Sequence, residues 1–209
     1  MMGRCLLILW AVMCWQSHLI LLLKGRKKGI AGHLIRKIEE NGDCLDTGFL
    51  TTPYLLDALC KIGRMDKAYK ILLQTKCPSW LYEVKQGATT VWEHWDGIME
   101  DGGFWSADMN SFNHYAYGSV ADWIYEEAAG IRPLEPGFAQ AQVAPKPDRR
   151  LGWLEASIET RHGLVRSRWE YQDGGIRYEI EAEMPVSVVI DGTKRQVPAG
   201  SYIFWGSEK

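Results

Sequence analysis

The stretch NSFNHYAYGSVADWIYEEAAGIRPLEPG, residues 110–137, decides the fold, because two kinds of structure meet inside it. From near Ser111 to Gly130 its apolar residues recur at helical spacing, which predicts a helix. The helix cannot continue through Pro133 and Pro136, because proline lacks the backbone N–H that a helix needs. The sequence therefore predicts a domain boundary here, with helices before it and a different structure after it.

After this boundary, apolar and polar residues alternate, which is the pattern of half-buried β-strands. Successive runs of this kind are separated by pairs that favour hairpin turns, namely His162-Gly163, Asp173-Gly174 and Asp191-Gly192. We therefore expect an antiparallel β-sandwich over residues 133–209.

Before the boundary, short helices are joined by short loops. They are predicted over residues 29–40 with a stop at Asn41-Gly42, from a cap at Thr52 with Pro53 as first helical residue to a stop at Gly63, and from Asp66 onward. A long polar and aromatic loop lies between Trp80 and Asn110. Antiparallel helix pairs with such a loop are typical of a helical barrel or bundle with a ligand site at its mouth.

The first residues of the chain do not fit this pattern. Residues 6–23 form an apolar run of nearly bilayer-spanning length, but Gln16, Ser17 and His18 interrupt it at a cost in lipid. Basic residues follow the run, the reverse of a secretory signal. We interpret residues 1–28 as an atypical apolar leader and leave open a membrane segment, a buried helix or a stretch outside any fold. The compartment stays open, with the cytoplasm favoured.

Composition indicates the class of partner. A net charge of −2 gives no reason to expect nucleic acid or an anionic membrane. Ten tryptophans and nine tyrosines supply flat rings with polar edges, which suit sugar binding, although the same rings also build protein cores. The five cysteines form no CxxC pair, and no acidic spacing matches a calcium loop. We therefore expect no metal and no cofactor.

The motif ATTVWEHWDG, residues 88–97, carries the candidate chemistry. If residues 89–95 are extended, Glu93 and Trp95 share one face, so a carboxyl group lies beside an indole ring. Poor solvation there raises proton affinity and suits general acid or base work. The alternative is that Glu93 is an ordinary surface residue of an aromatic hairpin.

Three segments together resemble a known family. DTGFLTTPYLL, ATTVWEHWDG and NSFNHYAYGSVADWIYEEAAGIRPLEPG are similar, in order and spacing, to the C-terminal part of the bacterial α-L-rhamnosidases of glycoside hydrolase family 78. The resemblance covers about residues 29–204. It implies an α plus β multidomain fold, in which the C-terminal half of an (α/α)6 barrel, residues 29–132, precedes the sandwich. Thr51 and Leu81 depart from the family's small residues, which affects loop shape.

The resemblance also implies roles for single residues. Glu93 corresponds to the family's general base, and His114 to a histidine that contacts the bound sugar. Asn110 and Asn113 stand near His114, where amide groups could orient a hydroxyl or the attacking water. The candidate sugar-stacking rings are Trp80, Trp92, Trp95, Trp105 and Tyr115, of which Trp92, Trp95 and Trp105 rank first because they lie in the loop.

The resemblance places the general acid in an Asp/Glu-rich segment upstream of the early barrel helices, and nothing in residues 1–45 matches that segment. Inverting glycosidases hold two carboxyl groups roughly 6.5–9.5 Å apart, and one cannot do the work of both. The local acidic residues are a weak substitute, since two of them precede glycine as turn formers do. These candidates are Asp96, Glu100, Asp101 and Asp108.

We therefore expect a fragment of an inverting α-L-rhamnosidase that hydrolyses terminal α-L-rhamnosyl residues from a rhamnose-containing glycoside or polysaccharide. By itself the fragment is expected to be incomplete and inactive, and to self-associate through its exposed barrel face. The alternatives are a non-catalytic carbohydrate-binding or remnant protein and another (α/α)6 glycosidase.

Overall fold

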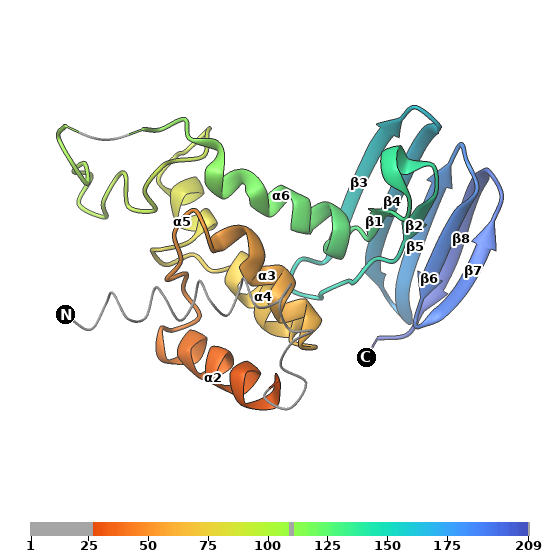
Figure 1. The fold of residues 1–209 in the computed structure, drawn as a ribbon, viewed down its shortest axis with the longest axis horizontal. Helices are drawn as coiled ribbons and strands as arrows, with labels where there is room; N and C mark the ends of the chain where they lie inside the picture. The colour runs from red at the N-terminus through yellow and green to blue at the C-terminus, as the bar shows by residue number, and fades with distance from the viewer. Residues whose placement is uncertain (1–26, 109–110, 209) are drawn as a thin grey trace. The chain divides into compact units, whose positions relative to one another are not determined.

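The computed structural model describes residues 27–108 and 111–208, and Figure 1 shows helices in the first part of this range and β-strands in the second. The apolar run at residues 6–23 lies outside the described residues. Among the helices that are described, none has the length and apolar character needed to cross a bilayer. Internal contacts divide the chain into two compact units, Met1–Val120 and Ala121–Lys209.

The first unit is helical. Its elements are α2 (Lys27–Glu40), α3 (Thr52–Lys61), α4 (Met65–Leu72), α5 (Trp80–Lys85) and the 3-10 helix η2 (Tyr115–Ser119). Figure 1 shows α3 and α4 side by side above α2. The predicted stop signals are confirmed, since Gly42 and Gly63, which follow α2 and α3, both adopt positive φ. The core of this unit contains the fully buried side chains Ile38, Leu45, Leu55, Leu59, Tyr69 and Ile71.

The predicted cap of α3 is wrong by one residue. Thr51 precedes the helix and makes no side-chain capping bond, while Thr52 is the first helical residue. The Thr52 hydroxyl instead donates to the carbonyls of Thr47 and Gly48, at 3.2 and 3.0 Å. Its hydrogen bonds therefore hold the preceding loop rather than the helix end, and this loop carries Phe49 to the candidate site.

An ion-pair cluster fixes the end of α2 to α4. The Lys67 ammonium, 9% exposed, lies 2.9 Å from Asp43 Oδ1, and the Lys70 ammonium lies 2.7 Å from Asp43 Oδ2. Burial raises the pKa of the Asp43 carboxyl, but the hydrogen bonds from Lys70 and Lys67 outweigh it, so the pKa is lowered. The cluster thus stabilises this junction through Asp43 and Lys67, which are largely out of water, and through Lys70, which stays half-exposed.

Two elements differ from the prediction within residues 80–130. Helix α5 occupies the start of the expected loop, with Ser79 as N-cap accepting from the Tyr82 N–H at 3.1 Å. The helix expected from Ser111 begins only at Tyr115. His114 has extended backbone angles, and its backbone N–H donates to the Val91 carbonyl instead of to a helical neighbour. Helix α5 is too short for periodicity to reveal, and periodicity does not locate the first residue of the second helix.

The second unit begins with the end of one helix and continues as two four-stranded sheets. Its elements are α6 (Val120–Trp123), the π-helical turn η3 (Ile124–Ala128), β1 (Ile131–Pro133), η4 (Pro136–Phe138), β2 (Ala141–Val143), β3 (Trp153–Thr160), β4 (Gly163–Gln172), β5 (Gly175–Ala182), β6 (Val186–Ile190), β7 (Thr193–Val197) and β8 (Gly200–Gly206). The strand orders are β1-β2-β6-β7 and β3-β4-β5-β8, and only β2 and β6 pair in parallel.

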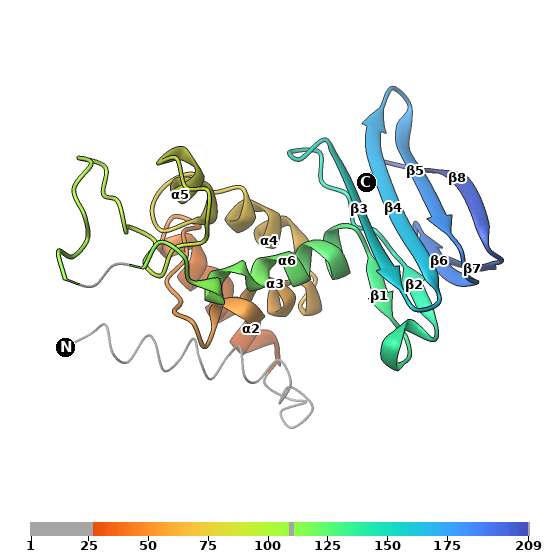
Figure 2. The ribbon, with the colours of Figure 1, turned by 90° about the horizontal axis from the view of Figure 1, so that it is seen from above.

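The sandwich core lies between these sheets, which Figure 2 shows as separate layers. Val143, Val186 and Val188 from one sheet pack in one cluster with Val165 and Ile180 from the other. The predicted turns join consecutive antiparallel strands, β3 to β4, β4 to β5 and β6 to β7. The alternation of residues along the strands therefore marks the buried face as the sequence predicts.

The helix end is joined to the sandwich by hydrogen bonds. The Trp169 indole donates to the Ala128 carbonyl at 2.8 Å, and the Ser167 hydroxyl donates to the Ala129 carbonyl at 2.7 Å. Gly130 follows at φ 78°, and a Cβ there would lie 2.1 Å from the Ala144 carbonyl carbon. Residues 121–132, grouped with the helices by sequence, are thus packed with the sandwich.

Candidate functional site

Two loop segments pair to bring the predicted base and the predicted sugar contact together. The Glu93 N–H donates to the Ser111 carbonyl at 2.9 Å, and the His114 N–H donates to the Val91 carbonyl at 2.8 Å. These bonds fix the backbone of the first motif against that of the second. Glu93 and His114 are therefore held on adjoining segments, although they are distant in sequence.

Both tryptophans of the first motif are buried. Trp92 is 3% exposed and Trp95 8% exposed, whereas Glu93 is half-buried. In an extended segment the two tryptophans would face opposite sides, so the prediction that residues 89–95 are extended is wrong. The segment bends at Glu93 and His94 and turns at Trp95, which lets both rings enter the interior.

Stacked rings anchor the motif to η2. The Trp95 ring stacks on Tyr117 with centroids 3.7 Å apart and an interplanar angle of 19°, and the Trp80 ring meets Trp95 edge-on at 5.4 Å. The Trp80 indole also donates to the Tyr117 carbonyl at 2.9 Å. These contacts give Trp80 and Trp95 packing roles, and their predicted stacking on a sugar stays a prediction.

His114 is oriented by its neighbours. Its ring stacks on Phe49 at 4.6 Å and 13°, and its Nδ1 accepts from the Ala116 N–H at 3.4 Å. In the neutral ring the proton is therefore assigned to Nε2, which becomes the donor. Phe49 also contacts Tyr117 at 5.0 Å and stays 38% exposed. Sequence reasoning missed Phe49, whose role depends on a loop distant in sequence.

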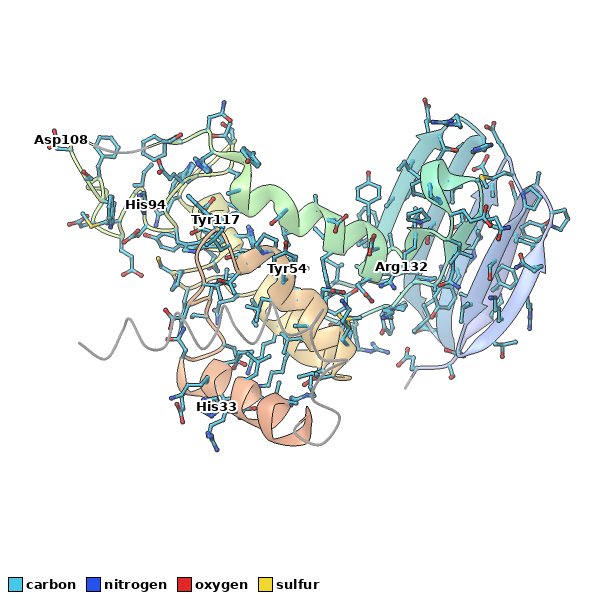
Figure 3. The ribbon with its side chains drawn as sticks, in the orientation of Figure 1. His33, Tyr54, His94, Asp108, Tyr117 and Arg132 are labelled. Atoms are coloured by element: carbon cyan, nitrogen blue, oxygen red, sulfur yellow. The ribbon has the colours of Figure 1, made fainter. Side chains whose placement is uncertain are left out.

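The loop after the motif presents a half-exposed ring. Trp105 is 44% exposed and stacks on His94 at 3.8 Å and 17°. The backbone N–H of Trp105 donates to the Gly97 carbonyl at 3.2 Å, which holds this part of the loop against the motif. Figure 3 shows His94 in the same part of the unit as Tyr117. Of the three rings ranked first, Trp105 alone combines this fixed position with an accessible face.

Glu83 is a buried carboxyl group that sequence reasoning missed. It is 4% exposed, its Oε2 accepts from the Trp92 N–H at 3.3 Å, and its Oε1 has no hydrogen-bond partner in the described part of the chain. Burial raises the pKa of Glu83 to about 7, against the lowering effect of the Trp92 N–H. The feature of the sequence that could have pointed to Glu83 is its position as an acidic residue within the apolar run that forms α5.

The carboxyl groups of Glu83 and Glu93 both affect the pKa of Tyr117. Its pKa is raised to about 12, first by burial and then by the negative charges of Glu83 and Glu93. The Glu93 carboxylate itself has no ion pair and no side-chain hydrogen bond among the described residues. A carboxylate in this position is available to accept a proton from water.

The remaining predicted residues lie at the surface or outside the described range. Tyr115 is 90% exposed, with its ring 5.8 Å from that of His114, and Asn113 is exposed. Asn110 falls in the part of the second motif that is not described. Their predicted sugar contacts stay predictions.

None of the local carboxyl groups considered as the general acid is fully buried. Asp101 accepts from the Gly103 N–H at 2.9 Å, as a turn former does, and Glu100 is exposed. Asp108 lies at the outer end of the loop in Figure 3. Across residues 27–108 and 111–208, no group of three or more His, Cys, Asp or Glu side chains could hold a metal ion.

Two family models match the chain. The model described as bacterial alpha-L-rhamnosidase 6 hairpin glycosidase domain matches residues 20–128, and the model described as bacterial alpha-L-rhamnosidase C-terminal domain matches residues 130–196. Together they cover the helical unit and most of the sandwich.

Individual relatives agree with these matches. An alpha-L-rhamnosidase of Streptomyces avermitilis is 45% identical over 71% of this chain, and one of Formosa agariphila is 40% identical over 77%. The chain spans only 14% and 17% of their lengths. The crystal structure of Streptomyces avermitilis alpha-L-rhamnosidase complexed with L-rhamnose matches 94% of this chain and 21% of that one, with a TM-score of 0.87 and 35% identity. The predicted fold class, a helical barrel end followed by a sandwich, is confirmed.

Proposed function

Because the chain belongs to the bacterial α-L-rhamnosidases with a six-hairpin glycosidase domain, we propose that it forms part of an inverting enzyme that hydrolyses terminal α-L-rhamnosyl residues. The substrate class is a rhamnose-containing glycoside or polysaccharide. The observation that carries the proposal is the pairing of the two motif segments, which holds Glu93 and His114 together beside half-exposed aromatic rings.

Glu93 is proposed as the general base. Its half-buried carboxylate has no ion-pair partner in the described residues, so its oxygen atoms are free to accept a proton from water. In an inverting mechanism this carboxylate activates the water that attacks the sugar carbon from the face opposite the leaving group. The Ser111 carbonyl and the buried Trp92 fix the backbone from which Glu93 projects.

His114 is proposed as a sugar contact. The Ala116 N–H occupies Nδ1, so Nε2–H is the group left to donate to a sugar hydroxyl. The stack with Phe49 restricts rotation of the imidazole ring, which reduces the entropy lost on binding. Trp105 is the accessible ring that could cover one face of the sugar.

The general acid is proposed to come from a part of the enzyme upstream of this segment. None of the local candidates is fully buried, since Glu100, Asp101 and Asp108 are exposed and Asp96, which precedes Gly97 as a turn former does, is half-buried. An inverting enzyme needs a second carboxyl group that protonates the leaving oxygen.

The test is Glu93→Gln in a complete enzyme that carries this segment. We expect turnover of an aryl α-L-rhamnoside to fall by a factor of at least about 10³, with an unchanged unfolding midpoint, because the base is lost and the shape is kept. Glu100→Gln, an exposed carboxyl group of the same loop, is the control and should retain turnover within about twofold. Near-normal turnover of Glu93→Gln would remove Glu93 from the role of base.

A further inference from the structure

Glu83 is a buried side chain that bonds to the backbone beside the proposed base. It belongs to α5, whose start is fixed by the Ser79 cap, and it is 4% exposed. Its Oε2 accepts from the Trp92 N–H at 3.3 Å, and Trp92 directly precedes Glu93. The interior of the helical unit is thus connected to the motif one residue before the base.

This bond is one of two that fix the backbone leading to Glu93. The Trp92 N–H is held by the Glu83 carboxyl group, and the next N–H, that of Glu93, is held by the Ser111 carbonyl at 2.9 Å. Because a peptide group is planar, each bond fixes the orientation of a whole peptide unit. The two consecutive units before the Glu93 Cα are therefore fixed, which limits the directions that the Glu93 side chain can take.

The Trp92 N–H depends on Glu83 as its acceptor. The bond lies in the interior, where Trp92 is 3% exposed, and Oε2 of Glu83 accepts it within residues 27–108 and 111–208. A buried N–H without an acceptor costs free energy, so the segment would shift to find another partner if the carboxyl group were lost. Such a shift would move Glu93 together with Trp92, because the two residues are adjacent.

Two further observations place Glu83 at the site and not only in the core. Its Oε1 is buried without a hydrogen-bond partner among the described residues, and such a group in a folded protein calls for an explanation beyond packing. The negative charges of Glu83 and Glu93 both raise the pKa of Tyr117, so the two carboxyl groups lie around the same phenol. Buried carboxyl groups with such neighbours gather at functional sites.

We propose that Glu83 is a positioning residue for the general base. It holds the Trp92 N–H and thereby the direction of the Glu93 carboxylate, without touching the sugar. The inference rests on the proposed function, in which Glu93 activates the attacking water. Because a displacement of about 1 Å in a reacting group can slow catalysis by about a hundredfold, the loss of this bond should lower kcat and leave KM nearly unchanged.

The test is a pair of variants in a complete enzyme that carries this segment, assayed with an aryl α-L-rhamnoside. Glutamine and methionine both have the length of glutamate, but only glutamine keeps an oxygen that can accept from the Trp92 N–H. Glu83→Met should therefore lower kcat by about tenfold or more, with KM within about threefold of the native value. Glu83→Gln should retain kcat within about threefold, which a loss of packing or of charge alone does not explain.

A shorter carboxylate and a double variant sharpen this test. Glu83→Asp withdraws the acceptor from the Trp92 N–H and should lower kcat by about fivefold or more, which keeps the proposal testable should Glu83→Met fail to fold. Glu83→Met added to Glu93→Gln should lower kcat by no more than about a further threefold, because a base that is absent cannot be misplaced.

A buried carboxylate away from the motifs is the matched control. Asp43, 6% exposed in the same helical unit, is bonded to Lys67 and Lys70, and Asp43→Asn should leave kcat within about twofold although it weakens the fold. An equal loss of kcat in Asp43→Asn would show that lowered stability alone explains the effect of Glu83→Met, and would overturn the proposal.

Three other results would overturn it. These are native kcat in Glu83→Met or Glu83→Asp, an equal loss in Glu83→Gln and Glu83→Met, and a full additional loss when Glu83→Met is combined with Glu93→Gln. Near-normal kcat of Glu93→Gln alone would instead remove Glu93 from the role of base, so failure of the proposed function is told apart from failure of the role given to Glu83.

Discussion

Replacing Glu83 by glutamine is expected to stabilise the protein increasingly as the pH rises. Glu83 is 4% exposed, and its Oε1 is buried without a partner in the described residues. Burial raises its pKa to about 7, so the folded state holds the proton more tightly than the unfolded state does. The stabilising contribution is then present in full below pH 4.5 and is lost as the pH rises through about 7.

The size of the effect follows from the same quantities. A rise in pKa from 4.5 to about 7 at roughly 1.4 kcal/mol per tenfold change in acidity gives about 3 kcal/mol. Glutamine carries no charge at any of these pH values and keeps an oxygen that can accept from the Trp92 N–H. The variant should therefore match the native chain within about 1 kcal/mol near pH 4.5 and exceed its stability by about 2–3 kcal/mol above pH 8.

The assay is urea unfolding followed by tryptophan fluorescence at pH 4.5, 6, 7 and 8.5, in the native chain and in Glu83→Gln. Other titrating groups affect both chains alike and cancel in the difference. Glu100→Gln, which removes an exposed carboxyl group nearby, should show a difference that stays within about 0.5 kcal/mol at every pH. A Glu83→Gln difference that is constant with pH, or that grows in favour of the native chain, would refute the reasoning.

Two further variants test what stabilises each unit. Asp43→Asn should lower the free energy of unfolding by about 2 kcal/mol at neutral pH in urea titrations, because it removes the buried carboxylate partner of Lys67 and leaves it only the half-exposed Glu39, while asparagine tolerates the positive φ of 58°. The loss should vanish as the pH falls below the lowered pKa of Asp43, and a loss that persists in acid would contradict the ion-pair account. Gly130→Ala should cost at least about 3 kcal/mol, because its Cβ would lie 2.1 Å from the Ala144 carbonyl carbon at φ 78°; thermal unfolding measures this, and Gly174→Ala, with open space around its Cβ, is the milder control.

Sequence alone determined the parts of the fold that depend on local pattern. Strict alternation and the Asp-Gly turns located the sandwich strands, and glycine stop signals located the ends of α2 and α3. These features could be read directly because a strand or helix places its apolar residues on one face with a fixed period. The three ordered motifs likewise identified the family and selected Glu93 and His114.

Tertiary structure decided how the candidate site is assembled. The bonds that join the segment of Glu93 to the segment of His114 run between loops with no period to reveal them. The burial of Glu83 and Trp95 depends on which distant segments cover them, such as Tyr117 over Trp95. Local period reports which face of an element is apolar, whereas burial and proximity depend on what the rest of the chain packs against that face.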